Sequence, residues 1–79
     1  MNTNALFDIY TLNHETPGED LTISIAKYQA ANPGVVSPED SKAMREFIGK
    51  HGKTLSGAYR KGKASFQATV EVLEAEDNK

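Results

Sequence analysis

The clearest pattern of hydrophobic and polar positions covers residues 37–50. Ser37 is a typical N-cap, Pro38 suits the first helical position, and Asp40 completes a capping box. Side chains recur at helical spacing on two opposite faces. One face holds Ala43, Met44, Phe47, Ile48 and His51, and the other holds Lys42, Arg45, Glu46 and Lys50. The pattern predicts an amphipathic helix that ends at Gly49 or Gly52.

The spacing of apolar side chains in residues 20–31 fits both a strand and a helix. Leu21, Ile23 and Ile25 alternate as in a strand, whereas Leu21, Ile25 and Tyr28 share one face of a helix. The second half of the segment consists mostly of adequate helix formers. The Asn-Pro-Gly sequence at residues 32–34 is typical of a helix stop, because the residue before proline avoids the α region. We therefore favour a helix here.

Strands are predicted near both ends of the chain. Leu6–Leu12 is rich in β-forming residues. Ser65–Leu73 alternates between apolar and polar side chains, as a half-buried strand does. A helix with Phe66, Val70 and Leu73 on one face is the alternative for this second segment.

The remaining segments complete the expected organisation. Residues 54–61 predict a short helical turn that Thr54 caps and Gly62 ends, with Leu55 and Tyr59 as inward anchors. The acidic end, residues 74–79, is expected to fray. Residues 1–79 then form a single compact domain of the α+β class, dominated by central helices with terminal strands. An all-α bundle is the alternative.

Composition limits the function classes. The chain has 79 residues, of which 38% are hydrophobic, and it has no cysteine. A domain this short commits most apolar side chains to its core and has few left for a deep pocket. We therefore expect no enzyme activity, no cofactor and no small-molecule substrate. The chain shows no signal-like start and no long apolar run, which predicts a cytoplasmic protein without membrane contact.

No known catalytic or metal-binding pattern is complete. Gly52-Lys53-Thr54 matches the end of a phosphate loop, but Phe47 stands where the first glycine of that motif belongs. His14 and His51 have no spacing typical of metal ligands. We therefore predict no catalytic residues and no metal site.

Charge is distributed unevenly along the chain. Residues 42–63 carry seven Lys or Arg and one acid, a net charge of +6, whereas the rest of the chain has a net charge of −8. Phosphates attract such a segment by counterion release, and a tyrosine within it can stack on a base. The predicted binding residues are Lys42, Arg45, Lys50, Lys53, Tyr59, Arg60, Lys61 and Lys63. These predict docking on nucleic acid or a nucleoprotein.

Other interpretations stay open. The basic segment can instead pair with the acidic segments of the same fold or form a solvated face. It can also bind an acidic protein surface. In that case the chain is a stoichiometric inhibitor or adaptor, of the type that phage and mobile-element accessory genes encode, with Tyr10, Tyr28 or Tyr59 as a hot spot. A helix-turn-helix built from residues 43–50 and 55–61 is a further alternative for DNA binding.

Overall fold

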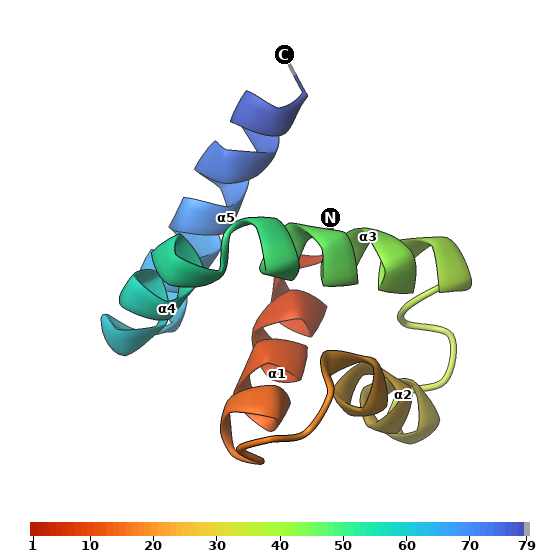
Figure 1. Cartoon of the computed structure of the whole chain (residues 1–79). Coiled ribbons are helices and arrows are strands. Elements are labelled where there is room, and N and C mark those ends of the chain that lie inside the picture. Colours follow the sequence, from red (N-terminus) through yellow and green to blue (C-terminus); the bar gives the residue numbers. More distant parts are fainter. Residues whose placement is uncertain (79) are drawn as a thin grey trace.

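Five helices make up residues 1–78, the part of the chain that the computed structural model describes (Figure 1). The helices are α1 (Thr3–His14), α2 (Leu21–Ala31), α3 (Pro38–Lys50), α4 (Gly52–Arg60) and α5 (Lys63–Asp77). No strand occurs in this range. Helix α1 packs against α2 and α5, α4 packs against α5, and α3 contacts α2 and α4.

The prediction of an α+β fold is wrong, and the domain belongs to the all-α class. Leu6–Leu12 lies in α1, and Ser65–Leu73 lies in α5. In α5, Phe66 and Val70 are fully buried, whereas Val72 is 58% exposed. This burial follows the i, i+4 spacing of a helix rather than the i, i+2 spacing of a strand. The alternation in the sequence therefore came from exposed apolar side chains on the outer face of a helix.

Helix α1 shows the same competition between propensity and burial. Its residues Ala5, Leu6 and Ile9 are buried together, a set that only helical spacing brings to one face. Asn2 caps the helix by accepting a hydrogen bond from the Ala5 backbone N–H at 3.1 Å. Burial on this face therefore outweighs the β-forming composition of the segment.

The two helices predicted in the middle of the chain are confirmed. Helix α3 begins with the expected capping box, in which the Ser37 hydroxyl accepts from the Asp40 backbone N–H at 3.1 Å. Helix α2 follows Asp20, whose carboxylate accepts from the Thr22 N–H at 2.8 Å. Helix α4 starts at Gly52, earlier than the turn predicted at residues 54–61.

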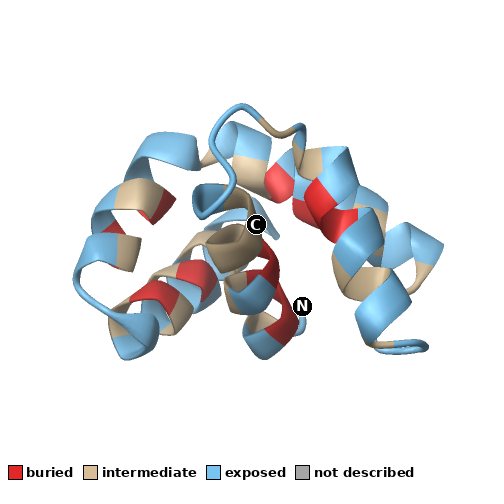
Figure 2. Cartoon of the chain, turned by 90° about the horizontal axis from the view of Figure 1, so that it is seen from below, coloured by how far each residue is buried: buried red, intermediate tan, exposed pale blue. Residues whose placement is uncertain are grey.

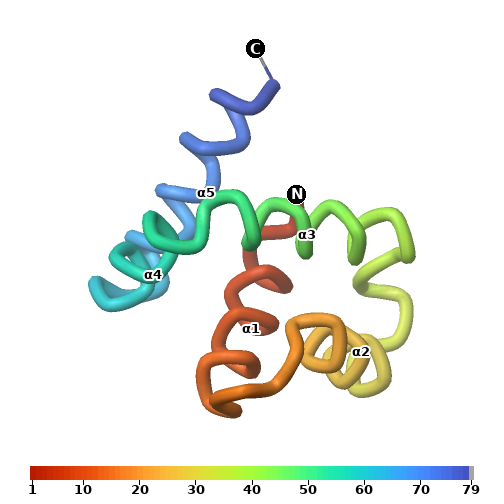
Figure 3. Tube along the Cα trace, in the orientation of Figure 1, coloured from red at the N-terminus to blue at the C-terminus, as the bar shows by residue number. Residues whose placement is uncertain are grey.

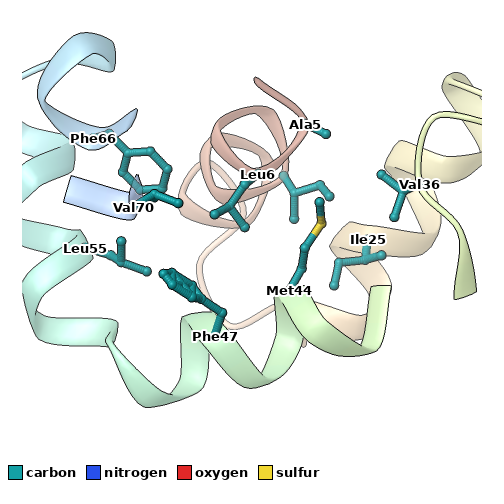
Figure 4. Close-up of a cluster of buried hydrophobic side chains, with 10 residues drawn as sticks. Ala5, Leu6, Ile25, Val36, Met44, Phe47, Leu55, Phe66 and Val70 are labelled. Carbon is teal, nitrogen blue, oxygen red and sulfur yellow. The ribbon is translucent and has the colours of Figure 1, made fainter. Parts of the chain in front are cut away.

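All five helices, together with Val36 in the connection between α2 and α3, contribute to one hydrophobic core. Figure 4 shows its side chains converging from α1, α2, α3, α4 and α5. The buried cluster consists of Ala5, Leu6, Ile9, Ile25, Val36, Met44, Phe47, Leu55, Phe66 and Val70. Figure 2 shows that buried positions lie on the helix sides that face each other and that the outer sides are exposed. A shared core of this kind fixes the relative positions of the helices that carry the charged residues.

The loop between α1 and α2 is held by the Asn13 side chain and by an ion pair. The Asn13 amide donates to the Glu19 carbonyl oxygen at 3.0 Å and to the Ser24 hydroxyl at 3.1 Å. Ser24 is fully buried, so this hydrogen bond satisfies a polar group that has no access to water. The Lys27 ammonium lies 2.8 Å from the Glu19 carboxylate and anchors the same loop to α2.

Residues 74–77 of the acidic end continue α5, and two of their carboxylates form ion pairs. Glu74 lies 3.1 Å from the Met1 ammonium, and Asp77 lies 2.9 Å from the Lys50 ammonium. Figure 3 shows the last turns of α5 extending beyond α3. Lys79, the final residue of the predicted frayed end, lies outside the described residues.

Two valines of α5 test the helical assignment. Val70→Ala removes buried methyl groups, and we expect it to lower the free energy of unfolding by about 2 kcal/mol. Val72→Ala changes an exposed position, for which we expect a change within about 0.5 kcal/mol. Urea denaturation followed by circular dichroism measures both. Equal losses would indicate that both valines face the core, as in a strand.

Candidate functional site

The seven cations of the basic segment, residues 42–63, lie at several separate places. Lys50 is next to Asp77 at the end of α5, whereas Lys63 begins that helix. At 1.5 Å per residue, the helix separates these two ends by about 20 Å. Lys50 is therefore held by the protein's own carboxylate and lies far from the cations at the start of α5.

Lys42 and Arg45 are exposed residues of α3. Hydrogen bonds from Thr22 hold the pKa of the Asp20 carboxyl below its ordinary value, and the positive charge of Arg45 contributes to this lowering. Asp20 caps the start of α2. Arg45 is therefore near the start of α2, and Figure 1 shows α2 and α4 on opposite sides of α1.

Three cations gather at the turn between α4 and α5. We call Arg60, Lys61 and Lys63 the cationic corner; all three are exposed, and within residues 1–78 none of them forms an ion pair. Gly62 has a φ of 113°, in the left-handed region that glycine adopts readily. Gly62 lies in the turn between α4 and α5, with Lys61 and Lys63 as its neighbours in the chain.

Lys53 extends the cationic corner along α4. It lies seven residues before Arg60 on the same helix, so the two side chains share a face. Both are exposed. The basic segment thus supplies four cations to α4 and to the turn that follows it.

Tyr59 fits between α1 and α4 as part of an aromatic seam. The seam consists of Phe7, Tyr10, His14, Tyr59 and Phe66. The Tyr59 ring centroid lies 5.0 Å from that of Tyr10, 5.1 Å from His14, 5.5 Å from Phe7 and 6.1 Å from Phe66. These distances are typical of favourable aromatic pairs. Tyr59, predicted as a base-stacking residue, therefore also ties α4 to α1.

A hydrogen bond fixes the orientation of this tyrosine. The Tyr59 hydroxyl donates to the Thr11 hydroxyl at 3.1 Å. Lys63 approaches the same seam, since its ammonium lies 5.4 Å from the centroid of the Phe7 ring. The cationic corner and the aromatic seam are therefore adjacent.

A pocket of about 410 Å³ opens beside the seam. We call it the aromatic pocket; it is lined by Tyr10, His14, Ser56, Tyr59 and Arg60. Its lining joins aromatic rings to a guanidinium group and hydroxyl groups. This combination can accept a flat, polar ligand and place negative charge at its edge.

A second pocket, of about 450 Å³, lies at the opposite end of α5. Its charged lining includes the Met1 ammonium and Lys50, but also Glu46, Glu74 and Asp77. Carboxylates and ammonium groups there pair with one another. This pocket is therefore less suited to a polyanion than the aromatic pocket, whose lining holds no carboxylate.

Sequence reasoning did not place Tyr10 and His14 at the site. The sequence pattern indicates Tyr10 only as a hot spot for a protein partner and gives His14 no role; in the structure His14 is the last residue of α1. The strand predicted for residues 6–12 puts Phe7 and Tyr10 on opposite faces. Helical spacing of Phe7, Tyr10 and His14 is the signal that identifies the seam.

The helix-turn-helix alternative does not match the geometry. That motif joins two helices by a turn of about three or four residues. Here His51 alone separates α3 from α4. The cationic corner instead lies between α4 and α5.

Within residues 1–78, no three acidic or histidine side chains come together as a metal site requires. None of the described helices is both long and apolar enough to span a membrane.

No family model matches the chain, and comparisons with curated proteins and with solved structures give no significant similarity.

Tyr59→Phe tests whether the hydroxyl anchors α4. We expect the free energy of unfolding to fall by about 1 kcal/mol, because one hydrogen bond is lost. Thr11→Val removes the partner, and the double variant should then cost less than the sum of the two single variants. Urea denaturation of all four proteins gives this coupling, and strictly additive losses would contradict the role of the hydroxyl pair.

Asp77 gives a pH-dependent prediction. Its hydrogen bond with His51 has the largest effect and its hydrogen bond with Lys50 the next largest. Together they hold the pKa of the Asp77 carboxyl below its ordinary value. A carboxyl with a lowered folded-state pKa stabilises the fold above its unfolded pKa, and this contribution disappears as the pH falls through the folded value. Asp77→Asn should therefore lower the melting temperature at pH 7 and have less effect below about pH 4.

Glu76→Gln is the matched control for this measurement. Glu76 is an exposed neighbour on α5 that forms no ion pair within residues 1–78. We expect this variant to change the melting temperature little at either pH. A deficit of Asp77→Asn that stays the same at pH 7 and pH 3 would argue against the ionised carboxylate as its cause.

Proposed function

We propose that this protein is a non-enzymatic binding protein that docks on nucleic acid, free or within a nucleoprotein complex, through its basic segment, with the cationic corner as the centre of contact. The observation that supports the proposal most strongly is the gathering of Arg60, Lys61 and Lys63 at one turn, beside an aromatic pocket, without partners among the described carboxylates. The cytoplasmic location expected from the sequence is part of this proposal.

Electrostatics favours this face for a polyanion. The chain outside residues 42–63 has a net charge of −8, which repels phosphates. A polyanion is therefore oriented toward the basic segment as it approaches. Cations without an internal partner contribute more to phosphate binding, since no ion pair has to be broken first. The cationic corner is therefore better suited to bind phosphates than Lys50, which is paired with Asp77.

The salt dependence of binding tests this proposal. For three phosphate contacts, we expect the affinity for a fluorescein-labelled oligonucleotide to fall about 20- to 40-fold between 50 and 200 mM salt. Fluorescence anisotropy titrations with single-stranded and duplex probes measure this dependence. If neither probe binds at 50 mM salt, the proposal is wrong, and an acidic protein partner becomes the better explanation for the basic segment.

A matched pair of double variants locates the contact. Arg60→Ala/Lys61→Ala and Lys42→Ala/Arg45→Ala each remove one arginine and one lysine from exposed positions. We expect the first pair to weaken binding about tenfold and to reduce the salt slope by about two, as phosphate contacts do. The second pair should have a much smaller effect. Equal losses would show that net charge, rather than the cationic corner, determines binding.

A further inference from the structure

We propose that the aromatic pocket receives one unpaired base of a single-stranded nucleic acid, while the cationic corner binds the adjoining phosphates. This inference rests on the function proposed above and adds to it the form of the ligand. It also assigns a role to Tyr10 and His14, which lie outside the basic segment, and to Ser56, an uncharged residue within it.

The walls of the pocket are suited to the flat face of a base. Tyr10, His14 and Tyr59 contribute aromatic rings to a space of about 410 Å³. The Tyr59 ring is held by its hydrogen bond to Thr11 and by the neighbouring rings. The site therefore exists before the ligand arrives, which reduces the entropy lost on binding. Stacking on aromatic side chains is the usual way in which proteins hold unpaired bases.

Polar groups around the pocket are available for the edge of the base. Within residues 1–78, the side chains of Tyr10, His14, Ser56 and Arg60 form no hydrogen bond with another residue. The polar edges of nucleobases carry both donors and acceptors, so hydroxyl, imidazole and guanidinium groups can all pair with them. Tyr59 differs from these residues because its hydroxyl is already used by the fold.

Three cations lie in or near the lining of the pocket. Arg60 lines the pocket itself, and Lys61 is its neighbour in the chain. The Lys63 ammonium is 5.4 Å from the Phe7 ring, whose centroid is 5.5 Å from that of Tyr59. A strand whose base enters the pocket therefore has cations for the phosphates next to that base.

This arrangement favours a single strand over a duplex. In a duplex the base faces are stacked on one another, so a base reaches such a pocket only after it is extruded at an energetic cost. An unpaired strand avoids most of this cost. Nonspecific duplex binding would need cations but no pocket. The base is thus the part of the ligand that distinguishes this inference from charge attraction alone.

The experiment compares ligands that differ in the presence of bases, in the sugar and in base pairing. Fluorescence anisotropy at one fixed salt concentration measures binding of a 12-nucleotide oligothymidylate, an oligouridylate, an abasic oligomer of the same length and a duplex. We expect at least one base-carrying strand to bind about tenfold tighter than the abasic oligomer, as stacking of one base provides. It should also bind tighter than the duplex. The two base-carrying strands show whether DNA or RNA supplies the base.

Two variants on α4 connect this preference to the pocket. Ser56→Leu fills the pocket and removes a hydroxyl, without changing the charge. Thr54→Leu adds a similar side chain at an exposed position of the same helix, outside the pocket lining. We expect Ser56→Leu to abolish the tenfold advantage of the base-carrying strand and Thr54→Leu to keep it. Loss of the advantage in both variants, or in neither, would overturn the assignment to this pocket.

The wild-type protein provides a readout that does not depend on the folding of a variant. Proton NMR should show shifts of the His14 imidazole and Tyr10 ring signals with the preferred base-carrying strand but not with the abasic oligomer. Equal affinities for the abasic oligomer and both base-carrying strands, with a steep salt dependence, would overturn this inference and leave the proposed function standing. Absence of binding to every probe would reject both.

Discussion

The packing of Tyr59 against α1 joins α4, which also packs against α5 and α3, to α1, and the arrangement of the candidate site depends on it. The tyrosine is next to Phe7, Tyr10 and His14 along one side of α1, and its hydroxyl reaches Thr11. These contacts orient the end of α4, from which the chain turns into α5. The aromatic seam therefore has a structural task and also forms a wall of the aromatic pocket. One side chain links the stability of the fold to the geometry of the surface.

Local signals in the sequence predicted part of the fold. Helix α3 was identified correctly because its capping box, its proline and its helical spacing all point to the same structure, and none of them depends on distant contacts. Helices α1 and α5 were predicted as strands. Short runs such as Leu6–Leu12 fit both periods, and the outcome is decided by which faces meet other helices in the core. That choice is made by tertiary burial, which the sequence pattern does not contain.

The candidate site was predictable in its charge but not in its arrangement. The concentration of cations in residues 42–63 is visible in the sequence. Their division among three places follows from the directions of α3, α4 and α5, so it could not be read from spacing. The pairing of Lys50 with Asp77 joins positions 27 residues apart. The position of Tyr10 beside Tyr59 likewise required α1 to be recognised as a helix.

The conformation of Gly62 has a consequence for how this surface can change during evolution. Positions 60, 61 and 63 are exposed, so lysine and arginine can replace one another there while the backbone keeps its course. Position 62 has a positive φ of 113°, which side chains with a Cβ rarely tolerate. Descendants of this sequence can therefore retune the strength of the surface charge freely. Any residue with a Cβ at position 62 would instead strain the backbone of the bend that leads into α5.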